Sequence, residues 1–409
     1  MKLFNFNKSK EPEVPTQKTD ENSEFKGEAL SYQYAETPIN IWQKVSSQGW
    51  VRFGENDKFY DNLLFLYDQS PMHRAILDRK IDMIVGGGYS INEDKYKMLS
   101  TEKQVLVDKL LKYTDGRNDI LEFLKSIIFD YLLTGQYSFL TSFTDGNASI
   151  ISLKHKDITK VRIKPDCDDD EKIDEFIYCK NFNSSAEVAK AKCYEPFDIF
   201  NKEHNLQMYY YANPCTSVEY YSLPSYFSAI KWIEVDTMIA NLHKSNLING
   251  FAPSVLMTFK ENPTPEVKKN ILKNIVGAFT NTNNVGKVAA FFVDDAELAP
   301  DITTFEPNSI HDRYNELNKT TDSKILTAHN VTSPELFGLM SPANLGNSDI
   351  DISYQIFKNT IINPLQSHFE KLVNNILKFN GVNIEFKLNE ITLYSKADQA
   401  QQVMRPPKN

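Results

Sequence analysis

The sequence predicts an α+β fold, because helical and strand patterns fall in separate stretches of the chain. Apolar residues recur at three- and four-residue spacing in 222–249, 309–330 and 352–378, which is typical of long helices. Between residues 137 and 212, short segments rich in aromatic and β-branched residues are separated by turn residues, which indicates strands. With 20 Tyr and 26 Phe, the chain has enough apolar material for a packed core.

Charge and cysteine usage narrow the class of protein. The 45 basic and 54 acidic residues give a net charge of −9, which disfavours tight duplex binding because phosphate contacts need clustered Lys and Arg. The four cysteines lack Cys-x-x-Cys spacing, and the apolar start Met1–Phe6 is too short for a signal peptide, so we expect free thiols in a reducing cytoplasm. No run of about 18 apolar residues occurs, so no membrane span is expected.

The first 38 residues are predicted to be a disordered, solvated arm, since 7–29 is rich in Lys, Glu, Pro and Ser. Order is expected from about Ile39. Ser70 and Pro71 predict an N-cap and the first turn of a helix, which ends at Gly86-Gly87-Gly88. Because these glycines follow the helix, they indicate a helix stop and not a phosphate-binding loop.

Helices are also expected at 101–113 and 119–134, with Gly135 as the stop of the second. Asp145-Gly146-Asn147 predicts a hairpin turn. The strands expected in this part of the chain are 137–143, 148–153, 158–163, 176–179 and 207–212.

An acidic run, Asp166 and Asp168 to Glu171 with Lys172 beside it, suggests a metal-dependent nuclease as an alternative function. Metal sites, however, gather residues from separate elements, and these lie consecutively between two strands. A solvated hairpin loop is therefore the preferred interpretation.

The helix over 222–249 has two apolar sides. Trp232, Val235, Ile239 and Leu242 share one face, and Ile233 and Met238 form a second. Such a helix is expected to contact neighbours on more than one side, although an ordinary core helix remains an alternative.

Residues 251–308 predict a small β-α-β insertion, with strands at 254–259 and 288–293 around a helix at 263–279. The helix over 309–330 that follows is amphipathic, with a polar face that includes Asp312, Glu316 and Lys319. Its apolar stripe comprises Ile310, Tyr314, Leu317, Thr321, Ile325 and Ala328.

The next segment combines a Pro-turn at 331–338, a small polar loop at 339–349 and a long helix over 352–378. Pro364 lies inside the helical pattern and predicts a kink, because it removes a backbone hydrogen bond. Gly381 suits a left-handed helix stop, and 382–387 alternates as a half-buried strand.

No catalytic or metal-binding motif is visible. Seven histidines are scattered without metal-ligand spacing, and there is no Gly-x-Ser-x-Gly, phosphate-loop or His-Glu-x-x-His sequence, so we expect neither an enzyme nor a cofactor nor a metal. His329 is predicted to be a cation at the negative end of a helix dipole.

The region 220–380 resembles tailed-bacteriophage portal proteins of the HK97 type. The features that carry the resemblance are the turn Pro334-Glu335-Leu336-Phe337-Gly338, the Gly/Asn/Ser-bearing loop after it, and a helix containing Asn363-Pro364. Tyr221 to Tyr226 and Asn249 to Ser254 extend it upstream. The order and spacing of these motifs, and no single one of them, identify the family.

The resemblance implies a portal fold. It comprises a mixed α/β wing, two long stem helices flanking a β-α-β clip, a tunnel loop, a Pro-kinked helix and a short crown. The implied parts are an N-terminal arm 1–38, wing 39–221, first stem helix 222–250, clip 251–308, second stem helix 309–330, second part of the wing 331–379 with tunnel loop 339–349, and crown or tail 380–409.

The resemblance also implies a dodecameric ring at a unique capsid vertex of the virion, assembled in the host cytoplasm, that conducts double-stranded DNA during packaging and ejection without reading its sequence. The implied partners are the terminase large subunit, a head–tail adaptor, and the major capsid and scaffold proteins. Asp312, Glu316 and Lys319 become possible channel-lining residues. The DNA-facing tunnel-loop residues would be Met340, Ser341, Pro342, Ala343, Asn344, Leu345, Gly346, Asn347 and Ser348, most of them small or uncharged.

Another head–tail connector ring is a further alternative, although an adaptor would not need the insertion at 251–308.

Overall fold

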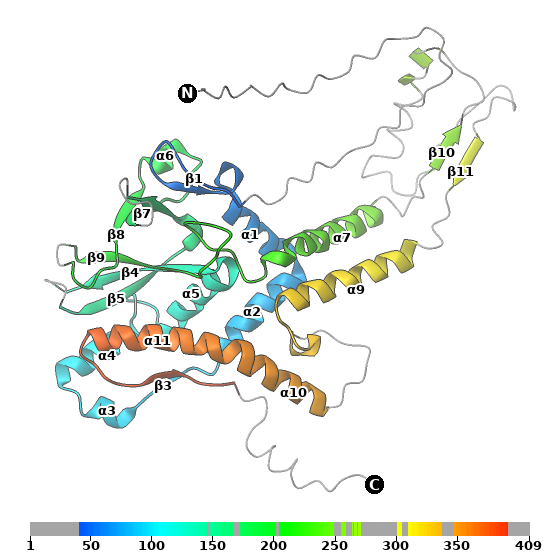
Figure 1. Ribbon diagram of the computed structural model, residues 1–409. Helices are drawn as coiled ribbons and strands as arrows, with labels where there is room; N and C mark the ends of the chain where they lie inside the picture. Colours follow the sequence, from blue (N-terminus) through cyan, green and yellow to red (C-terminus); the bar gives the residue numbers. More distant parts are fainter. Residues whose placement is uncertain are drawn as a thin grey trace, which may run out of the picture. The chain divides into compact units, whose positions relative to one another are not determined.

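The computed structural model describes residues 41–144, 148–166, 172–201, 204–248, 255–258, 264, 266–267, 269–270, 301–304, 310–337 and 347–391. The predicted arm at 1–38 and the tail from 392 onward lie outside these residues. The architecture is α+β, as predicted, with one large sheet, several helices packed on it and a pair of long helices (Figure 1).

The described chain begins with a hairpin of β1 (Gln43–Val45) and β2 (Val51–Phe53), followed by α1 (Phe59–Gln69) and α2 (Pro71–Val85). The Ser70 side chain accepts a hydrogen bond from the His73 backbone N–H, which confirms the predicted N-cap. The helix α1 was not expected from the sequence.

The three glycines after α2 allow the chain to approach a strand from far along the sequence. A Cβ on Gly87 would lie 2.0 Å from the backbone oxygen of Asn389. Beside it, β3 (Tyr89–Ile91) pairs antiparallel with β12 (Phe386–Leu388). The helix-stop interpretation is confirmed, and the glycines also make room for this pairing.

Three short helices and one long one complete this half: α3 (Glu93–Lys97), α4 (Thr101–Lys112), α5 (Ile120–Thr134) and α6 (Ser185–Val188). Asp119 caps α5 by accepting from the Glu122 N–H, and Gly135 ends it with φ 79°. Both signals were predicted, and α5 is the helix on which the sheet packs.

The large sheet has the strand order β5-β4-β9-β8-β7-β6. All neighbours are antiparallel except β8 and β9, which are parallel. The strands are β4 (Gln136–Phe143), β5 (Ile150–Lys156), β6 (Val161–Pro165), β7 (Ile173–Tyr178), β8 (Lys192–Pro196) and β9 (Leu206–Ala212). Five were predicted, with boundaries shifted by up to three residues, whereas β8 was missed.

The core lies on both faces of this sheet. On one face Phe123 of α5 meets Phe139 edge-on at 5.3 Å, and Phe369 lies 5.6 Å from Tyr137. After β9, Tyr221 packs against β2: its ring stacks 5.1 Å from that of Phe53, and its hydroxyl donates to the Val51 carbonyl oxygen at 2.7 Å. Burying such aromatic side chains contributes about 1.5–3 kcal/mol each, so these contacts hold helices and sheet together.

The second half of the chain contains two long helices, α7 (Ile230–Ile248) and α9 (Ile310–Ala328). The prediction that the first begins at 222 is wrong, since a 3-10 turn at Phe227–Ala229 precedes it. Residues before this turn are held elsewhere: the Ser222 carbonyl accepts from Gln136, and the Tyr226 hydroxyl donates to the Leu133 carbonyl. These tertiary hydrogen bonds override the local helical pattern.

Between the two helices, β10 (Val255–Thr258) pairs antiparallel with β11 (Asp301–Thr304). The strand at 254–259 is thus confirmed. The expected partner strand 288–293 lies outside the described residues, and the observed partner was not predicted.

The last part is a 3-10 turn at Pro334–Phe337, α10 (Asn347–Phe357), a π-helical turn at Lys358–Ile362, and α11 (Asn363–Phe379). Pro364 lies in the first turn of α11, so the predicted interruption takes the form of a wide turn just before the proline. Gly381, at φ 68°, ends α11 as expected. Among the described residues, no helix is long and apolar enough to cross a membrane.

Candidate functional site

The two long helices form an antiparallel pair that leaves the sheet domain and returns to it (Figure 1). The start of the first helix lies near the end of the second, because the Tyr226 ring stacks 4.9 Å from the His329 ring. Ile233 on α7 and Ile325 on α9 are fully buried, which anchors the pair at its base. The most buried side of α7 is therefore centred on Ile233, not on the predicted stripe that ends at Leu242.

Away from the base, the helix pair exposes large apolar side chains. Met238 is 55% exposed, Leu242 36% and Leu317 38%. The predicted second apolar side of α7 is therefore divided: Ile233 is buried at the base of the pair, whereas Met238 faces solvent within this single chain. Such residues indicate a surface for protein contact.

The base of the pair is a buried cluster of two imidazoles and one ammonium. Nδ1 of His73 lies 3.0 Å from Nε2 of His329, and the Lys80 Nζ donates to the His329 carbonyl oxygen at 2.8 Å. Ser70 joins α2 to α7 by donating its hydroxyl proton to Asp236 at 2.6 Å. The cluster thus connects α2, α7 and the end of α9.

Protonation in this cluster differs from the sequence expectation. Burial and the nearby Lys80 charge lower the pKa of His73 to about 3, and burial, Lys80 and His73 lower the pKa of His329 well below its usual value. The prediction of a cationic His329 is therefore wrong, because the imidazole is too buried to hold a charge. Burial lowers the pKa of Lys80 to about 8, so Lys80 supplies the cation at the end of α9.

The predicted tunnel loop lies mostly outside the described residues. Its last part, Asn347 and Ser348, is already helical in α10, so the loop ends before the predicted boundary at 349. The frame on either side is well defined. Phe337, just before the loop, meets Phe357 edge-on at 5.5 Å, and the Thr332 hydroxyl donates to the Ser353 carbonyl oxygen at 2.9 Å. The turn before the loop is thus packed against the second half of α10.

The predicted channel-lining residues lie on α9. Glu316 and Lys319 are exposed, on the side away from the buried Thr321 and Ile325. Asp312 belongs to the same helix by its backbone. The structure therefore leaves Glu316 and Lys319 accessible along the helix pair.

The acidic run at 166–172 connects β6 and β7, which pair antiparallel. The Asp166 N–H donates to the Lys172 carbonyl at 2.8 Å, and the Lys172 ammonium lies 3.5 Å from the Asp166 carboxylate. The carboxylates at 168–171 lie outside the described residues. Both described ends have the geometry of a hairpin, the preferred interpretation.

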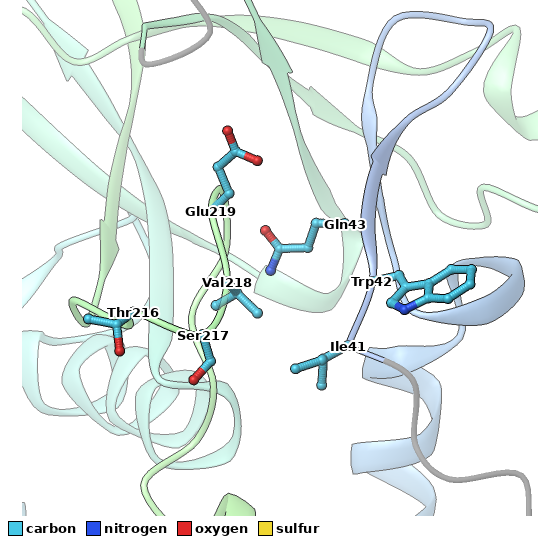
Figure 2. A pocket seen from close by; sticks show the side chains of 7 residues that line it. All are labelled: Ile41, Trp42, Gln43, Thr216, Ser217, Val218 and Glu219. Atoms are coloured by element: carbon cyan, nitrogen blue, oxygen red, sulfur yellow. The ribbon is translucent and has the colours of Figure 1, made fainter. Parts of the chain in front are cut away.

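An open depression lies between residues 41–43 and 216–219. Figure 2 shows Ile41 and Val218 pointing into it, whereas Trp42 points away. The Gln43 Oε1 accepts from the N–H groups of Tyr220 and Tyr221 at 2.6 and 3.0 Å. The one ionisable side chain in its lining is Glu219, so the depression offers no acid–base pair for chemistry.

Elsewhere in the described part of the chain, no group of three or more His, Cys, Asp or Glu side chains is arranged to hold a metal. Burial raises the pKa of Asp130 to about 6, but this carboxylate accepts from His155 at 2.8 Å and from the Ile158 N–H. It thus anchors the turn after β5 to α5. Neither the His73–His329 contact nor the Asp130–His155 contact was predictable from a local pattern, because each joins residues from distant segments.

Comparison with known proteins adds to this picture. No protein-family model and no curated protein matches the chain. Among solved structures, a chain from the neck of an empty gene transfer agent (GTA) particle computed with C6 symmetry matches with TM-score 0.55 and 14% identity, covering 84% of this chain and 87% of that one. A chain from the neck of a native GTA particle computed with C12 symmetry has TM-score 0.51 and 16% identity, covering 84% and 88%.

A third match is an HK97-family phage portal protein from Corynebacterium diphtheriae, with TM-score 0.47 and 10% identity, covering 84% of this chain and 96% of that one. The chain shares a fold with the two GTA neck chains, whose TM-scores exceed 0.5. More particularly, the two GTA neck chains support, at the level of the fold, the predicted resemblance to tailed-phage portal proteins.

Proposed function

We propose that this chain is a portal protein, copies of which form a ring at a unique capsid vertex. Double-stranded DNA would pass through the ring during packaging and ejection. The observation that carries the proposal is the antiparallel pair α7–α9, which projects from a mixed sheet domain in a chain whose fold matches GTA neck chains over 84% of its length.

In this proposal each part of the chain has a role. The sheet domain with α1–α6 is the first part of the wing, and α7 and α9 are the two stem helices. The segment 251–308, with the β10–β11 pair, is the clip. The turn before α10, the tunnel loop, α10 and α11 form the second part of the wing, and 380–409 is a short crown or tail.

Exposed apolar side chains support contacts between copies. Met238, Leu242 and Leu317 lie on the helix pair, and Ile352 and Ile356 of α10 are 59% and 49% exposed. Covering such side chains with a neighbouring copy stabilises an assembly by about 25 cal/mol per Å² of apolar surface. Because one similar neck was computed with C12 symmetry, we propose a ring of twelve.

The channel surface formed by the tunnel loops would have few groups that bind DNA phosphates. The tunnel-loop residues Met340 to Ser348 carry no charge, so they can lie near phosphates without binding them. Their position would be set by the contact of Phe337 with Phe357. Glu316 and Lys319 on α9 would line the channel beyond the loop, and recognition would not depend on DNA sequence.

The proposed partners are a terminase large subunit and later a head–tail adaptor at the clip, with the major capsid and scaffold proteins around the wing. The motor would hydrolyse ATP, so the portal itself needs no active site.

Imaging of the purified chain by negative-stain electron microscopy, together with native mass spectrometry, tests the proposal. We expect rings with a central hole wide enough for a B-form duplex. A monomer under all conditions, including in the presence of capsid and scaffold proteins, would overturn it.

Deleting 251–308 separates a portal from another connector ring. A portal lacking the clip is expected to keep its ring and lose motor docking, measured by co-sedimentation with the terminase. Retained docking would contradict the assignment of the clip.

A further inference from the structure

Three lysines of the large sheet have no carboxylate partner among the described residues. Lys154 and Lys156 are on β5, and Lys192 is on β8; we call these three residues the lysine patch. The Lys156 ammonium lies 4.5 Å from the ring centroid of Tyr178 and 5.7 Å from that of Tyr194. These contacts join β5 to β7 and β8 across a curved sheet, so the lysines converge although β4 and β9 lie between them.

The positive charge of the patch is not balanced by ion pairs within the described residues, where none of the three lysines forms one. The neighbouring Lys160 differs, since it is paired with Asp157 at 2.6 Å. Burial, and then the nearby charges of Lys154 and Lys192, lower the pKa of Lys156.

This clustering is unusual for a chain with net charge −9. Like charges held together without counter-charge are unfavourable, and an anionic partner would relieve the repulsion. Lys154 and Lys192 are exposed, so such a partner could reach them.

We propose that the lysine patch binds an acidic segment of another protein. This inference concerns the sheet domain and does not depend on the helix pair or on ring formation. Two or three carboxylates on an extended segment would match the three ammonium groups in number.

Nucleic acid fits less well. Proteins that bind duplexes strongly make about 6–10 phosphate contacts, and the patch offers three lysines. Single strands are bound largely by stacking of bases on aromatic rings, but here the Lys156 ammonium lies over the Tyr178 ring. The small number of ammonium groups and the covered Tyr178 ring therefore favour a partner with carboxylates over nucleic acid.

Fluorescence anisotropy with a labelled polyglutamate peptide tests the proposal on the full chain at low ionic strength. We expect the wild type to bind, and the variant Lys154→Glu/Lys192→Glu to bind roughly tenfold more weakly or worse, because two attractive charges become repulsive. Added salt should weaken wild-type binding. The milder variant Lys154→Gln/Lys192→Gln should lose affinity in the same direction.

The matched control is Lys97→Glu/Lys109→Glu, which makes the same charge change at two exposed lysines on α3 and α4. We expect it to bind the peptide like the wild type. Circular dichroism checks that both variants are folded; if charge reversal unfolds the chain, the Gln variant decides.

Three results would overturn the proposal: no peptide binding by the folded wild type, equal loss in both Lys→Glu variants, or patch-dependent binding of a duplex oligonucleotide without binding of the peptide.

Discussion

The imidazoles of His73 and His329 share one hydrogen bond of 3.0 Å, and the residues are 256 positions apart in the chain. One ring must donate and the other must accept, and burial keeps both rings neutral. Whichever ring donates, the outer nitrogens, His73 Nε2 and His329 Nδ1, are buried without a hydrogen-bond partner among the described residues. Neither imidazole can gain a proton without placing a charge beside Lys80.

This relationship predicts acid sensitivity. The pKa of His73 is lowered from 6.5 to about 3 in the folded chain, so its contribution to stability is complete above pH 6.5 and declines as pH falls toward 3. In the wild type, the unfolding free energy should fall between pH 7 and pH 5. In His73→Phe we expect this fall to be smaller by about 1–2 kcal/mol. Urea unfolding at the two pH values measures it.

The control is His204→Gln, which removes an imidazole whose side chain is 52% exposed and lies outside the cluster. Other ionisable groups near the cluster are Lys80 on α2, Asp236 on α7 and Asp322 on α9, and they remain in every variant. An unchanged pH dependence in His73→Phe would show that other groups determine acid stability.

A second prediction concerns the ion pair of Asp57 and Arg162, both almost fully buried. The Arg162 Nε lies 3.0 Å from both carboxylate oxygens, and Asp57 also accepts from the Phe53 N–H at 2.9 Å. Arg162→Met leaves a buried carboxylate unpaired and should lower the unfolding free energy by about 3–5 kcal/mol.

The double variant Asp57→Asn/Arg162→Met should recover part of this loss, because the uncompensated charge is gone. Chemical denaturation of the three proteins measures it. If the double variant were less stable than Arg162→Met alone, the charge would not be the cause.

Third, Gly87→Ala should separate the paired strands β3 and β12. The new Cβ would lie 2.0 Å from the Asn389 oxygen, which is backbone and cannot simply rotate away. We expect a loss of roughly 2–4 kcal/mol and faster amide exchange in both strands. Gly49→Ala is the control; it has φ 90° but no atom within 4 Å, so about 1 kcal/mol is expected.

Fourth, Met238→Asp/Leu317→Asp should prevent ring assembly while leaving the chain folded. Both side chains are exposed in the single chain, so unfolding free energy should change by less than about 1 kcal/mol. A neighbouring copy, however, would have to bury two carboxylates. Size-exclusion chromatography with light scattering measures the assembly state.

The matched control Met98→Asp/Val105→Asp places the same charges just after α3 and on α4, at side chains that are 84% and 63% exposed. It should assemble normally. If both variants form rings equally well, Met238 on α7 and Leu317 on α9 do not lie in the interface between copies.

The sequence was most informative where structure is set by local chemistry. The Ser70 cap, the stops at Gly135 and Gly381, and the alternating burial of 382–388 each depend on neighbours within a few residues. The predicted interruption at Pro364 is likewise local, because a proline ring acts on the turn before it.

Long-range features were not predictable in this way. The strand β8 reads Lys-Cys-Tyr-Glu-Pro, which has no apolar alternation, and it is defined by pairing with β7 and β9. The true start of α7 depends on hydrogen bonds to β4 and α5. The exposure of Glu316 and Lys319 follows from helical spacing, and their channel-lining role stays a prediction, whereas the His73–His329 contact left no local pattern.

The pairing of β3 with β12 bears on how the chain is made. During translation, Tyr89–Ile91 leaves the ribosome long before Phe386–Leu388 has been made. Until then, the backbone hydrogen-bonding groups of β3 lack the partner strand β12. A prematurely terminated product would keep that edge uncovered and be a ready target for proteases. Proteolysis of such truncated chains would leave mainly full-length subunits. This matters for any assembly that one defective subunit could disrupt.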